Sequence, residues 1–353
     1  MWTLEARTTP PRVLRLLSPV FALVLTLALG TALFAALGKP PLQALQLFLI
    51  QPWSSLSGLS ELSIKAVPLT LLALGLALCF RSNVWNIGAE GQFVLGALAA
   101  GWVSMQAGPD SSGPWWILVL LAGMVGGMLW AALVALLRDR FNANEILVSL
   151  MLVYVAILLL QFLMYGPWKD PQGYNFPQSI TFAAATQLPR PFQGLRLNLG
   201  VLLIPLAAIG LWALMFRTVA GFAWQVGGLA PAAARYAGFS SRQALWGSLL
   251  VCGALAGLAG AVEVAGPLRQ LTLYVPAGYG FAAIIVAFVG RLHPLGIVLA
   301  GILMSLFYIG GELAQTRMGL PKSMTTVFQG VLLFMLLLCD ALIHYRLVRR
   351  RSV

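Results

Sequence analysis

The chain has 353 residues, of which 60% are hydrophobic and 9% are charged, and its mean hydropathy is +0.88. Soluble domains carry about a quarter of their residues as Asp, Glu, Lys and Arg, so this composition excludes a cytosolic enzyme, a secreted disulfide scaffold and a disordered protein. The net charge of +12 comes from basic residues that lie between apolar runs, which indicates a membrane protein with basic loops rather than a nucleic-acid binder. We therefore expect membrane lipid as a partner and no nucleic acid.

Ten apolar segments are candidates for membrane crossing. A helix needs about 20 apolar residues to cross a hydrocarbon core of about 30 Å. With that window, the sequence predicts an all-α, polytopic fold with about ten transmembrane helices in a single transmembrane domain over 1–353. The predicted spans are 17–37, 62–80, 87–106, 115–137, 146–165, 197–216, 243–264, 271–290, 294–314 and 324–343.

The distribution of Lys and Arg predicts which loops face the cytoplasm, because these residues accumulate in cytoplasmic loops. With ten crossings and a cytoplasmic N-terminus, 14 of the 22 basic residues lie on the cytoplasmic side. The eighth span is uninterrupted only from Tyr279 to Gly290, and a re-entrant hairpin there would even the split to 11 and 11. Charge therefore favours ten crossings of the cell inner (plasma) membrane, with segment 1–16, loop 217–242 and tail 344–353 all cytoplasmic.

Two spans are interrupted by helix breakers or polar residues, each the third span of its half in a five-plus-five division. Backbone of this kind is tolerated at membrane depth only against protein or a water-lined cavity, and matching interruptions indicate a transport pathway in repeat-built transporters. We therefore predict a 5+5 inverted repeat with the two breaks at opposite faces of the membrane. The interrupting residues are Asn86, Gly88, Glu90, Gly91 and Gln92 in the third span, and Pro276, Gly278 and Gly280 in the eighth.

Acidic residues in or beside the spans are few. A charge at membrane depth costs at least about 2.5 kcal/mol, so it normally faces the interior of a bundle or lies at an interface. Glu263 either lines the pathway or pairs with Arg269, and Glu145 either caps the fifth span or contributes to the pathway or to a subunit contact. The candidate residues of the substrate pathway are Asn86, Glu90, Gln92, Glu263 and Tyr274, whose polar groups suit a small polar solute.

The sequence lacks the motifs of hydrolytic enzymes and of ATPases, including HExxH, GxSxG and GxxxxGK[ST]. Its two histidines, His293 and His344, both lie at span ends, whereas proton-coupled carriers typically have ladders of buried carboxylates or histidines. The three cysteines lie in apolar runs without a CxxC motif, which favours buried thiols over a metal site. We expect no catalytic residue, metal or cofactor in this chain, so active transport would take its energy from a partner.

Two local patterns predict how helices contact each other or a partner. Gly123–Gly127 and Gly253–Gly257 have the GxxxG spacing that permits close helix approach, which favours packing within the subunit over a subunit interface. In loop 217–242, a short helix is predicted over Pro231–Tyr236 and ended by Gly238, since proline at a helix start and glycine just past its end is the usual asymmetry. That helix would seat in another protein's groove or rest on the lipid surface.

Four motifs lie along the chain: Phe80–Gln92 (FRSNVWNIGAEGQ), Asn144–Leu152 (NEILVSLML), Ala233–Gly238 (AARYAG) and Gly290–Gly296 (GRLHPLG). Together they resemble the permease subunits of nucleoside and simple-sugar ABC importers, a group that also contains ribose and branched-chain amino-acid permeases. The resemblance extends from about residue 60 to about residue 340. Where that family usually has Asn-Pro-Glu-Ala-Ala-Arg, this sequence has Ala230-Pro231-Ala232-Ala233-Ala234-Arg235.

The resemblance implies an integral membrane permease subunit of an ABC importer that translocates a small polar solute, first a nucleoside and next a simple sugar. It implies a second related permease subunit, an extracytoplasmic substrate-binding protein and a cytoplasmic ABC ATPase, which would hold ATP and Mg²⁺. Loop 217–242 would be the coupling loop that docks on the ATPase, through Pro231, Ala233, Ala234, Arg235, Tyr236 and Gly238. The alternative is a secondary carrier or channel for a small neutral solute, and the missing catalytic motifs disfavour a membrane enzyme.

Overall fold

A computed structural model describes residues 2–6, 12–108, 111–321 and 323–349. The chain divides into two compact units: unit 1 comprises the residues up to Gly58 and those from Leu306 onwards, and unit 2 comprises Leu59–Ser305. The predicted cytoplasmic segments 1–16 and 344–353 are described in part, because 1, 7–11 and 350–353 lie outside the described residues. That the chain is a single transmembrane domain stays a prediction.

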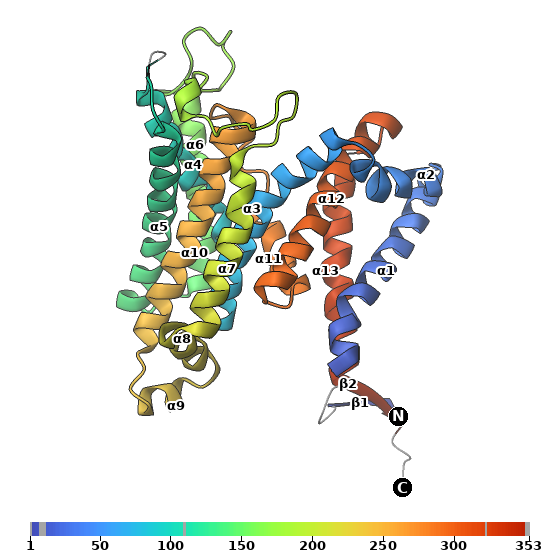
Figure 1. The fold of residues 1–353 in the computed structure, drawn as a ribbon. Helices are drawn as coiled ribbons and strands as arrows, with labels where there is room; N and C mark the ends of the chain where they lie inside the picture. The colour runs from blue at the N-terminus through green and yellow to red at the C-terminus, as the bar shows by residue number, and fades with distance from the viewer. Residues whose placement is uncertain (1, 7–11, 109–110, 322, 350–353) are drawn as a thin grey trace. The chain divides into compact units, whose positions relative to one another are not determined.

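The described residues are predominantly helical, which confirms the all-α prediction. Short turns of π- or 3₁₀-helix are η1 (Gln46–Ile50), η2 (Gln51–Trp53), η3 (Ala184–Thr186), η4 (Leu199–Leu202) and η5 (Val264–Leu268). The α-helices are α1 (Arg12–Ala36), α2 (Pro41–Leu45), α3 (Leu56–Arg81), α4 (Ala89–Gln106), α5 (Trp115–Phe141), α6 (Glu145–Tyr165), α7 (Leu203–Arg217), α8 (Val219–Leu229), α9 (Pro231–Tyr236), α10 (Ser241–Glu263), α11 (Tyr279–Val289), α12 (Pro294–Met318) and α13 (Ser323–His344) (Figure 1).

Each predicted span contains a helix, although two differ from the others. Among the described residues, eight helices are long and apolar enough to cross a membrane. The third predicted span contains α4, which begins at Ala89, and the eighth contains α11, which has only 11 residues. At a rise of 1.5 Å per residue, α11 covers about half of a hydrocarbon core. The segment predicted over 271–290 is therefore helical only in its second half.

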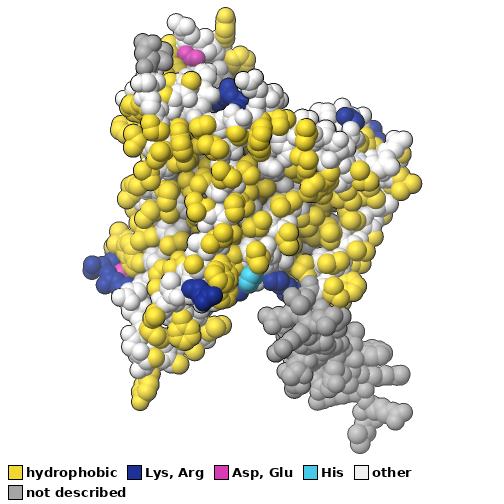
Figure 2. Space-filling model, viewed as in Figure 1, with side chains coloured by type: hydrophobic (Ala, Val, Ile, Leu, Met, Phe, Trp, Pro, Cys, Tyr) yellow, Lys and Arg dark blue, Asp and Glu magenta, His cyan; other side chains and the backbone are white. Residues whose placement is uncertain are grey.

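Unit 2 is built around α3, in which every residue from Ala66 to Cys79 is buried. A helix that is apolar on all sides is stable only inside a protein or a membrane. The most apolar stretches of α5 and α6 are only 28% and 22% buried, so these helices lie at the perimeter. On unit 2, at the left of Figure 2, hydrophobic side chains cover the middle of the visible face, and charged side chains lie towards the two ends. This pattern is the one expected of lipid-facing helices.

The two GxxxG pairs meet each other inside unit 2. A Cβ atom added at Gly127 would lie 2.2 Å from the carbonyl oxygen of Gly253, and one added at Gly257 would lie 2.0 Å from that of Gly123. On the neighbouring helix α4, a Cβ atom at Gly96 would lie 2.2 Å from the Cα atom of Gly257. The prediction that these glycines pack helices within the subunit is confirmed, since α4, α5 and α10 approach backbone to backbone.

In unit 1, α1 packs against α13 through a cluster of phenylalanines. The ring centroids of Phe34 and Phe328 lie 5.4 Å apart, and those of Phe48 and Phe328 lie 5.0 Å apart. The hydroxyl of Ser18 donates to Oδ1 of Asp340 at 2.6 Å, which gives this carboxylate a partner within the same unit. The strands β1 (Trp2–Ala6) and β2 (Tyr345–Arg349) pair antiparallel, with Trp2 opposite Arg349.

Candidate functional site

The two interrupted segments meet at Glu90. This residue lies in the first turn of α4, and 1% of its side-chain surface is exposed. Its Oε1 accepts a hydrogen bond from the backbone N–H of Gly278 at 2.8 Å, and its Oε2 accepts one from Gly280 at 2.5 Å. The first N–H groups of a helix have no partner within that helix, and they attract negative charge. Glu90 therefore caps the N-terminus of α11 from another helix.

Glycine is required at both positions that Glu90 contacts. Gly278 has φ +79°, in the left-handed region that other residues rarely adopt. A Cβ atom on Gly280 would lie 2.3 Å from the backbone nitrogen of Glu90. Gly278 thus supplies the left-handed turn before α11, and Gly280 lets the backbone of α11 approach the backbone at the start of α4.

The prediction that the two breaks lie at opposite faces of the membrane is wrong, because Glu90 and Gly278 are in contact. The reason lies in the path of residues 269–278, which run beside α4 before α11 begins. A Cβ atom at Gly101, near the far end of α4, would lie 2.4 Å from Leu271, whereas Gly278 reaches Glu90 at its start. The eighth span is thus broken near its middle and the third near its start. The inverted repeat itself stays a prediction.

Loop 166–198 satisfies the backbone of the irregular segment that precedes α11. The N–H of Ser179 donates to the carbonyl oxygen of Leu271 at 2.9 Å, and the hydroxyl of Ser179 accepts from the N–H of Leu271 at 2.9 Å. The N–H of Phe182 donates to the carbonyl of Arg269 at 2.9 Å. These bonds meet the requirement that non-helical backbone at membrane depth be paired with protein groups.

Asn86 and Gln92 are brought together in the core of unit 2, where both are fully buried. The Asn86 amide donates to Oε1 of Gln92 at 3.1 Å, and the Asn86 oxygen accepts from the N–H of Gly88 at 3.0 Å. The same amide lies 3.2 Å from the sulfur of Cys252 on α10. These contacts hold the turn between α3 and α4 in place. That either residue lines the substrate pathway stays a prediction.

The other two candidate pathway residues, Glu263 and Tyr274, differ from each other in exposure. Glu263 ends α10 and is 7% exposed, whereas Tyr274 lies in the irregular segment before α11 and is 83% exposed. The segment before α11 therefore runs from the surface, at Tyr274, to the interior, where Gly278 contacts the buried Glu90. Pathway lining by Glu263 and Tyr274 stays a prediction, as does the pairing of Glu263 with Arg269.

The sequence reasoning missed the contact of Lys65 with Tyr279, the first residue of α11. The ammonium group of Lys65, on α3, donates to the hydroxyl of Tyr279 at 2.8 Å. Tyr279 is 1% exposed, and its ring meets that of Phe93 edge to face, with centroids 5.9 Å apart. The available signal was the lysine itself, because Lys65 lies inside a predicted span, where a charge is costly without a partner.

Arg81, at the last position of α3, was also missed. Its Nε donates to the carbonyl oxygen of Leu292 at 2.8 Å, just past the end of α11, and its Nη1 donates to Oε1 of Gln225 on α8 at 3.0 Å. Its guanidinium lies 5.1 Å from the ring centroid of Phe216, within the range of a cation–π contact. One side chain of α3 thus contacts α7, α8 and the turn after α11. These contacts lie at the end of unit 2 that carries α9, which we call the α9 end.

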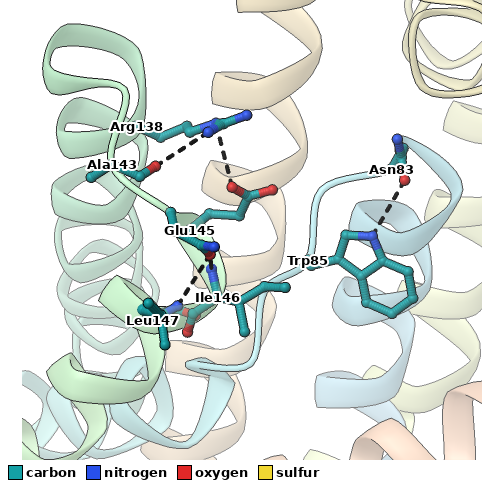
Figure 3. Close-up of polar contacts among 9 residues, drawn as sticks. Asn83, Trp85, Arg138, Ala143, Glu145, Ile146 and Leu147 are labelled. Atoms are coloured by element: carbon teal, nitrogen blue, oxygen red, sulfur yellow. Dashed lines mark hydrogen bonds and ion pairs between the residues drawn. The ribbon is translucent and has the colours of Figure 1, made fainter.

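Beside it, at the same end, Glu145 pairs with Arg138 rather than capping α6. The carboxylate lies 3.3 Å from Nε of Arg138, whose Nη1 also donates to the carbonyl of Ala143 (Figure 3). The cap of α6 is Asn144, whose side-chain oxygen accepts from the N–H groups of Ile146 and Leu147 at 2.9 and 3.4 Å. The prediction that Glu145 caps the free amides is wrong, because the shorter Asn144 side chain reaches them. Glu145 nevertheless lies in the first turn of α6, where its charge complements the helix dipole.

A pocket of about 330 Å³ opens at the α9 end. Its wall includes Asp139 on α5, which lies 2.7 Å from Arg242 and accepts a hydrogen bond from the indole N–H of Trp246 at 3.1 Å. These contacts tie the start of α10 to the end of α5. The pocket is lined by Ser82, Asn83, Val84, Arg138, Asp139, Glu145, Gly227, Gly228, Pro231, Ser241, Arg242, Ala244 and Leu245.

The loop 217–242 contains two helices, α8 and α9. Helix α9 spans Pro231–Tyr236 and is followed by Gly238 at φ +82°, which confirms the predicted helix and its stop. Ala234 is 2% exposed and faces the protein, whereas Tyr236 is 98% exposed. Helix α9 therefore presents a small surface outward while one side rests on its neighbours.

At the end of unit 2 opposite to α9, three arginines gather around the turn after α10. Arg190 donates to the carbonyl of Gly266 at 3.3 Å, and Arg196 donates to both carboxylate oxygens of Glu61 at 3.2 Å. Desolvation by burial lowers the pKa of Arg190, and the positive charges of Arg269 and Arg196 lower it further. We call Arg190, Arg196 and Arg269 the arginine cluster. Its three positive charges lie beside the carboxylate of Glu61.

Comparison with known proteins places this architecture in a family. Residues 58–337 match the model of the branched-chain amino acid transport system / permease component family. The chain belongs to this permease family. The match includes all of unit 2, and with it both interrupted segments, the Glu90 contact and the loop 217–242.

Individual relatives are permeases of ABC transporters. The chain is 33% identical to a glucose ABC transporter permease protein of Haloferax volcanii, over 97% of this chain and 92% of the relative. It is 29% identical to a guanosine ABC transporter permease protein of Bacillus subtilis, over 91% and 93%. It is 28% identical to a nucleoside ABC transporter permease protein of Lactococcus lactis, over 91% and 90%. No solved structure matches.

This permease is therefore an integral membrane subunit of an ABC importer, and its apolar helices place it in the plasma membrane. The alternative of a secondary carrier or channel is not supported, because the relatives are ABC transporter permeases. Permeases of this kind work with an ATPase and a substrate-binding protein.

Proposed function

We propose that this permease imports a nucleoside, driven by ATP hydrolysis in a partner subunit. The observation that carries this proposal is its similarity, over at least 90% of both chains, to guanosine and nucleoside permeases from two organisms. A simple sugar is the second candidate, favoured by the 33% identity to a glucose permease. Both solutes are neutral and rich in hydroxyl groups, which suits a chain with 9% charged residues and amide side chains at its broken span.

Uptake measurements separate the two candidates. The permease, reconstituted in liposomes with its ATPase, its second permease and its binding protein, is expected to import labelled guanosine and adenosine and to import labelled glucose or ribose more slowly. The control is the same complex without ATP. Import of the sugar with no import of either nucleoside would contradict the first candidate and establish the second.

In the proposed assembly the α9 end faces the cytoplasm, and loop 217–242 is the coupling loop that docks on the ATPase. This orientation follows the positive-inside rule, because the basic residues of unit 2 are more numerous at the α9 end than at the opposite end. The α9 end carries Arg81, Arg138, Arg140, Arg217, Arg235, Arg242 and Arg291, whereas the opposite end carries Lys65, Lys169, Arg190, Arg196 and Arg269. The exposed Tyr236 and the neighbouring Arg235 on α9 would contact the ATPase. We also propose that both chain termini are cytoplasmic and that a second related permease completes the pathway.

The double substitution Arg235→Glu and Gly238→Glu is expected to abolish co-purification of the ATPase. It reverses a charge on α9 and places a side chain where φ is +82°, so the docking surface loses both its charge and its turn. Pull-down from detergent-solubilised membranes measures the effect, and membrane insertion serves as the reference. Undiminished co-purification together with normal uptake would refute docking at α9.

The arginine cluster is proposed to receive acidic residues of the substrate-binding protein. Arg196→Glu is expected to weaken binding of that protein to the permease roughly tenfold or more, with an effect that shrinks at high salt, because rim charges act mainly on association. Surface plasmon resonance on nanodisc-embedded complex measures it. The matched control is Arg140→Glu, at an exposed position at the end of α5, which should leave this affinity unchanged; equal affinity of the Arg196→Glu variant would contradict the proposal.

A further inference from the structure

We propose that Arg81 and Gln225 form the link through which the coupling loop moves α11. This inference rests on the proposed function, because it takes loop 217–242 as the segment that the ATPase moves. It adds to that function a route from α8 to the half-length helix whose start is held by Glu90. The structure carries it in four sets of contacts, all within unit 2.

Gln225 is a rigid attachment point on α8. Its side-chain amide donates to the carbonyl of Met215 at 2.8 Å and to that of Gly221 at 3.1 Å. Its oxygen accepts from Nη1 of Arg81 at 3.0 Å. Because both the oxygen and the NH₂ group of the amide are hydrogen-bonded, the Gln225 side chain has one orientation. A displacement of α8 therefore moves the oxygen to which Arg81 is bonded.

Arg81 carries the link to the C-terminal end of α11. Its Nε donates to the carbonyl of Leu292 at 2.8 Å. Arg291 and Leu292 have φ +56° and +53°, a left-handed conformation that non-glycine residues adopt at a cost and keep only where the surroundings hold them. The Arg81 bond is one such restraint, and it acts on the turn that connects α11 to α12.

The partners of Arg81 indicate the role of its guanidinium group, since no carboxylate among the described residues pairs with it. Its hydrogen bonds go to neutral oxygens on two different elements, and its face lies on Phe216. A planar group with several donors in fixed directions suits such bridging. The geometry therefore favours a positioning role over charge neutralisation.

Helix α8 also abuts the start of the other broken span. A Cβ atom at Gly228 would lie 2.4 Å from the carbonyl carbon of Ser82 and 2.8 Å from the nitrogen of Asn83. From there the chain leads within a few residues to Glu90, which caps the start of α11. Helix α11 is thus held at both ends, by Glu90 and by Arg81. Helix α8 contacts Arg81 directly, and it contacts the turn that precedes α4, on which Glu90 lies. Contiguous packed elements of this kind can carry coupling between sites.

The test compares Gln225→Leu with Gln225→Glu in the full reconstituted complex. Leucine removes the acceptor of Arg81 and the two bonds that the amide donates, whereas glutamate keeps the acceptor and loses the two donated bonds. Uptake per ATP hydrolysed is therefore expected to fall roughly fivefold or more in the leucine variant and to fall less in the glutamate variant. The matched control is Gln243→Leu, at an exposed position on α10 at the same end. Assembly with the ATPase, measured by pull-down, is expected to be normal in all three variants.

A second readout follows α11 directly. In the wild type, ATP is expected to change the maleimide labelling rate of a cysteine introduced by Ala277→Cys, an exposed position just before α11, because the three native thiols are buried. Gln225→Leu should remove this ATP response. Normal uptake per ATP, or an unchanged ATP response, in an assembled leucine variant would overturn the link, and so would loss of assembly in that variant. Failure of the wild-type subunit to recruit an ATPase would instead overturn the proposed function.

Discussion

Glu90→Gln is expected to lower solute uptake by roughly tenfold or more, because it removes one of the two charge-assisted bonds that hold α11. Glutamine offers one oxygen where the carboxylate offers two, and its NH₂ group would face the N–H of Gly278 or of Gly280. A hydrogen bond to a charged group contributes about 1.5–3 kcal/mol, and an unpaired buried donor costs a similar amount. A change of about 1.4 kcal/mol is already tenfold in an equilibrium.

Uptake into proteoliposomes measures this effect, with thermal unfolding in detergent as a second observable. The matched control is Glu145→Gln, which removes a carboxylate from a partly exposed ion pair with Arg138. Pairs of that kind contribute at most about 1 kcal/mol, so the control should transport normally. Wild-type uptake by the Glu90→Gln variant would show that the capping contact does not position α11.

The largest effect on folding is expected from Gly257→Ala. Its new Cβ atom would lie 2.0 Å from the carbonyl oxygen of Gly123 and 2.9 Å from the backbone of Gly127. These are backbone atoms of a helix, so no side-chain rotation relieves the clash and α5 must move away from α10. Overpacking of a close-packed interior costs typically about 1–3 kcal/mol, and we expect the upper part of that range.

Thermal unfolding of the purified subunit and the yield of monodisperse protein measure the change. The matched control is Gly210→Ala on α7, where a Cβ atom would meet nothing within 4 Å. Alanine is favoured over glycine inside a helix by about 1 kcal/mol, so the control should unfold at the same temperature or higher. If Gly257→Ala unfolded like the wild type, the close packing of α5 on α10 would not be what stabilises unit 2.

Features that depend on neighbours along the chain were predicted from the sequence. The helical segments follow from sums of hydropathy over about 20 residues, and the start and stop of α9 follow from Pro231 and Gly238. The GxxxG pairs on α5 and α10 were predicted to pack within the subunit, because small residues at that spacing allow close approach. The four motifs led to the family that the comparison then showed.

Contacts between residues far apart in the sequence were predicted poorly. Glu90 was selected as a charge inside a broken span, but its partners lie 188 and 190 residues away. The two breaks were placed at opposite faces, since both come early in their predicted spans and the third and eighth spans were expected to run in opposite directions. Arg81 and Lys65 were passed over, because a basic residue near a span end normally contacts lipid headgroups or water.

The sequence by itself determined that this chain is a multi-span membrane permease, where its helices lie, and that it belongs with ABC importers. These properties follow from local composition and short motifs, which are additive along the chain. Only the tertiary structure decided that α11 is a half-length helix capped by Glu90 and restrained by Arg81. In a membrane each free N–H or carbonyl must find a partner inside the protein, and that choice depends on the approach of segments far apart in sequence.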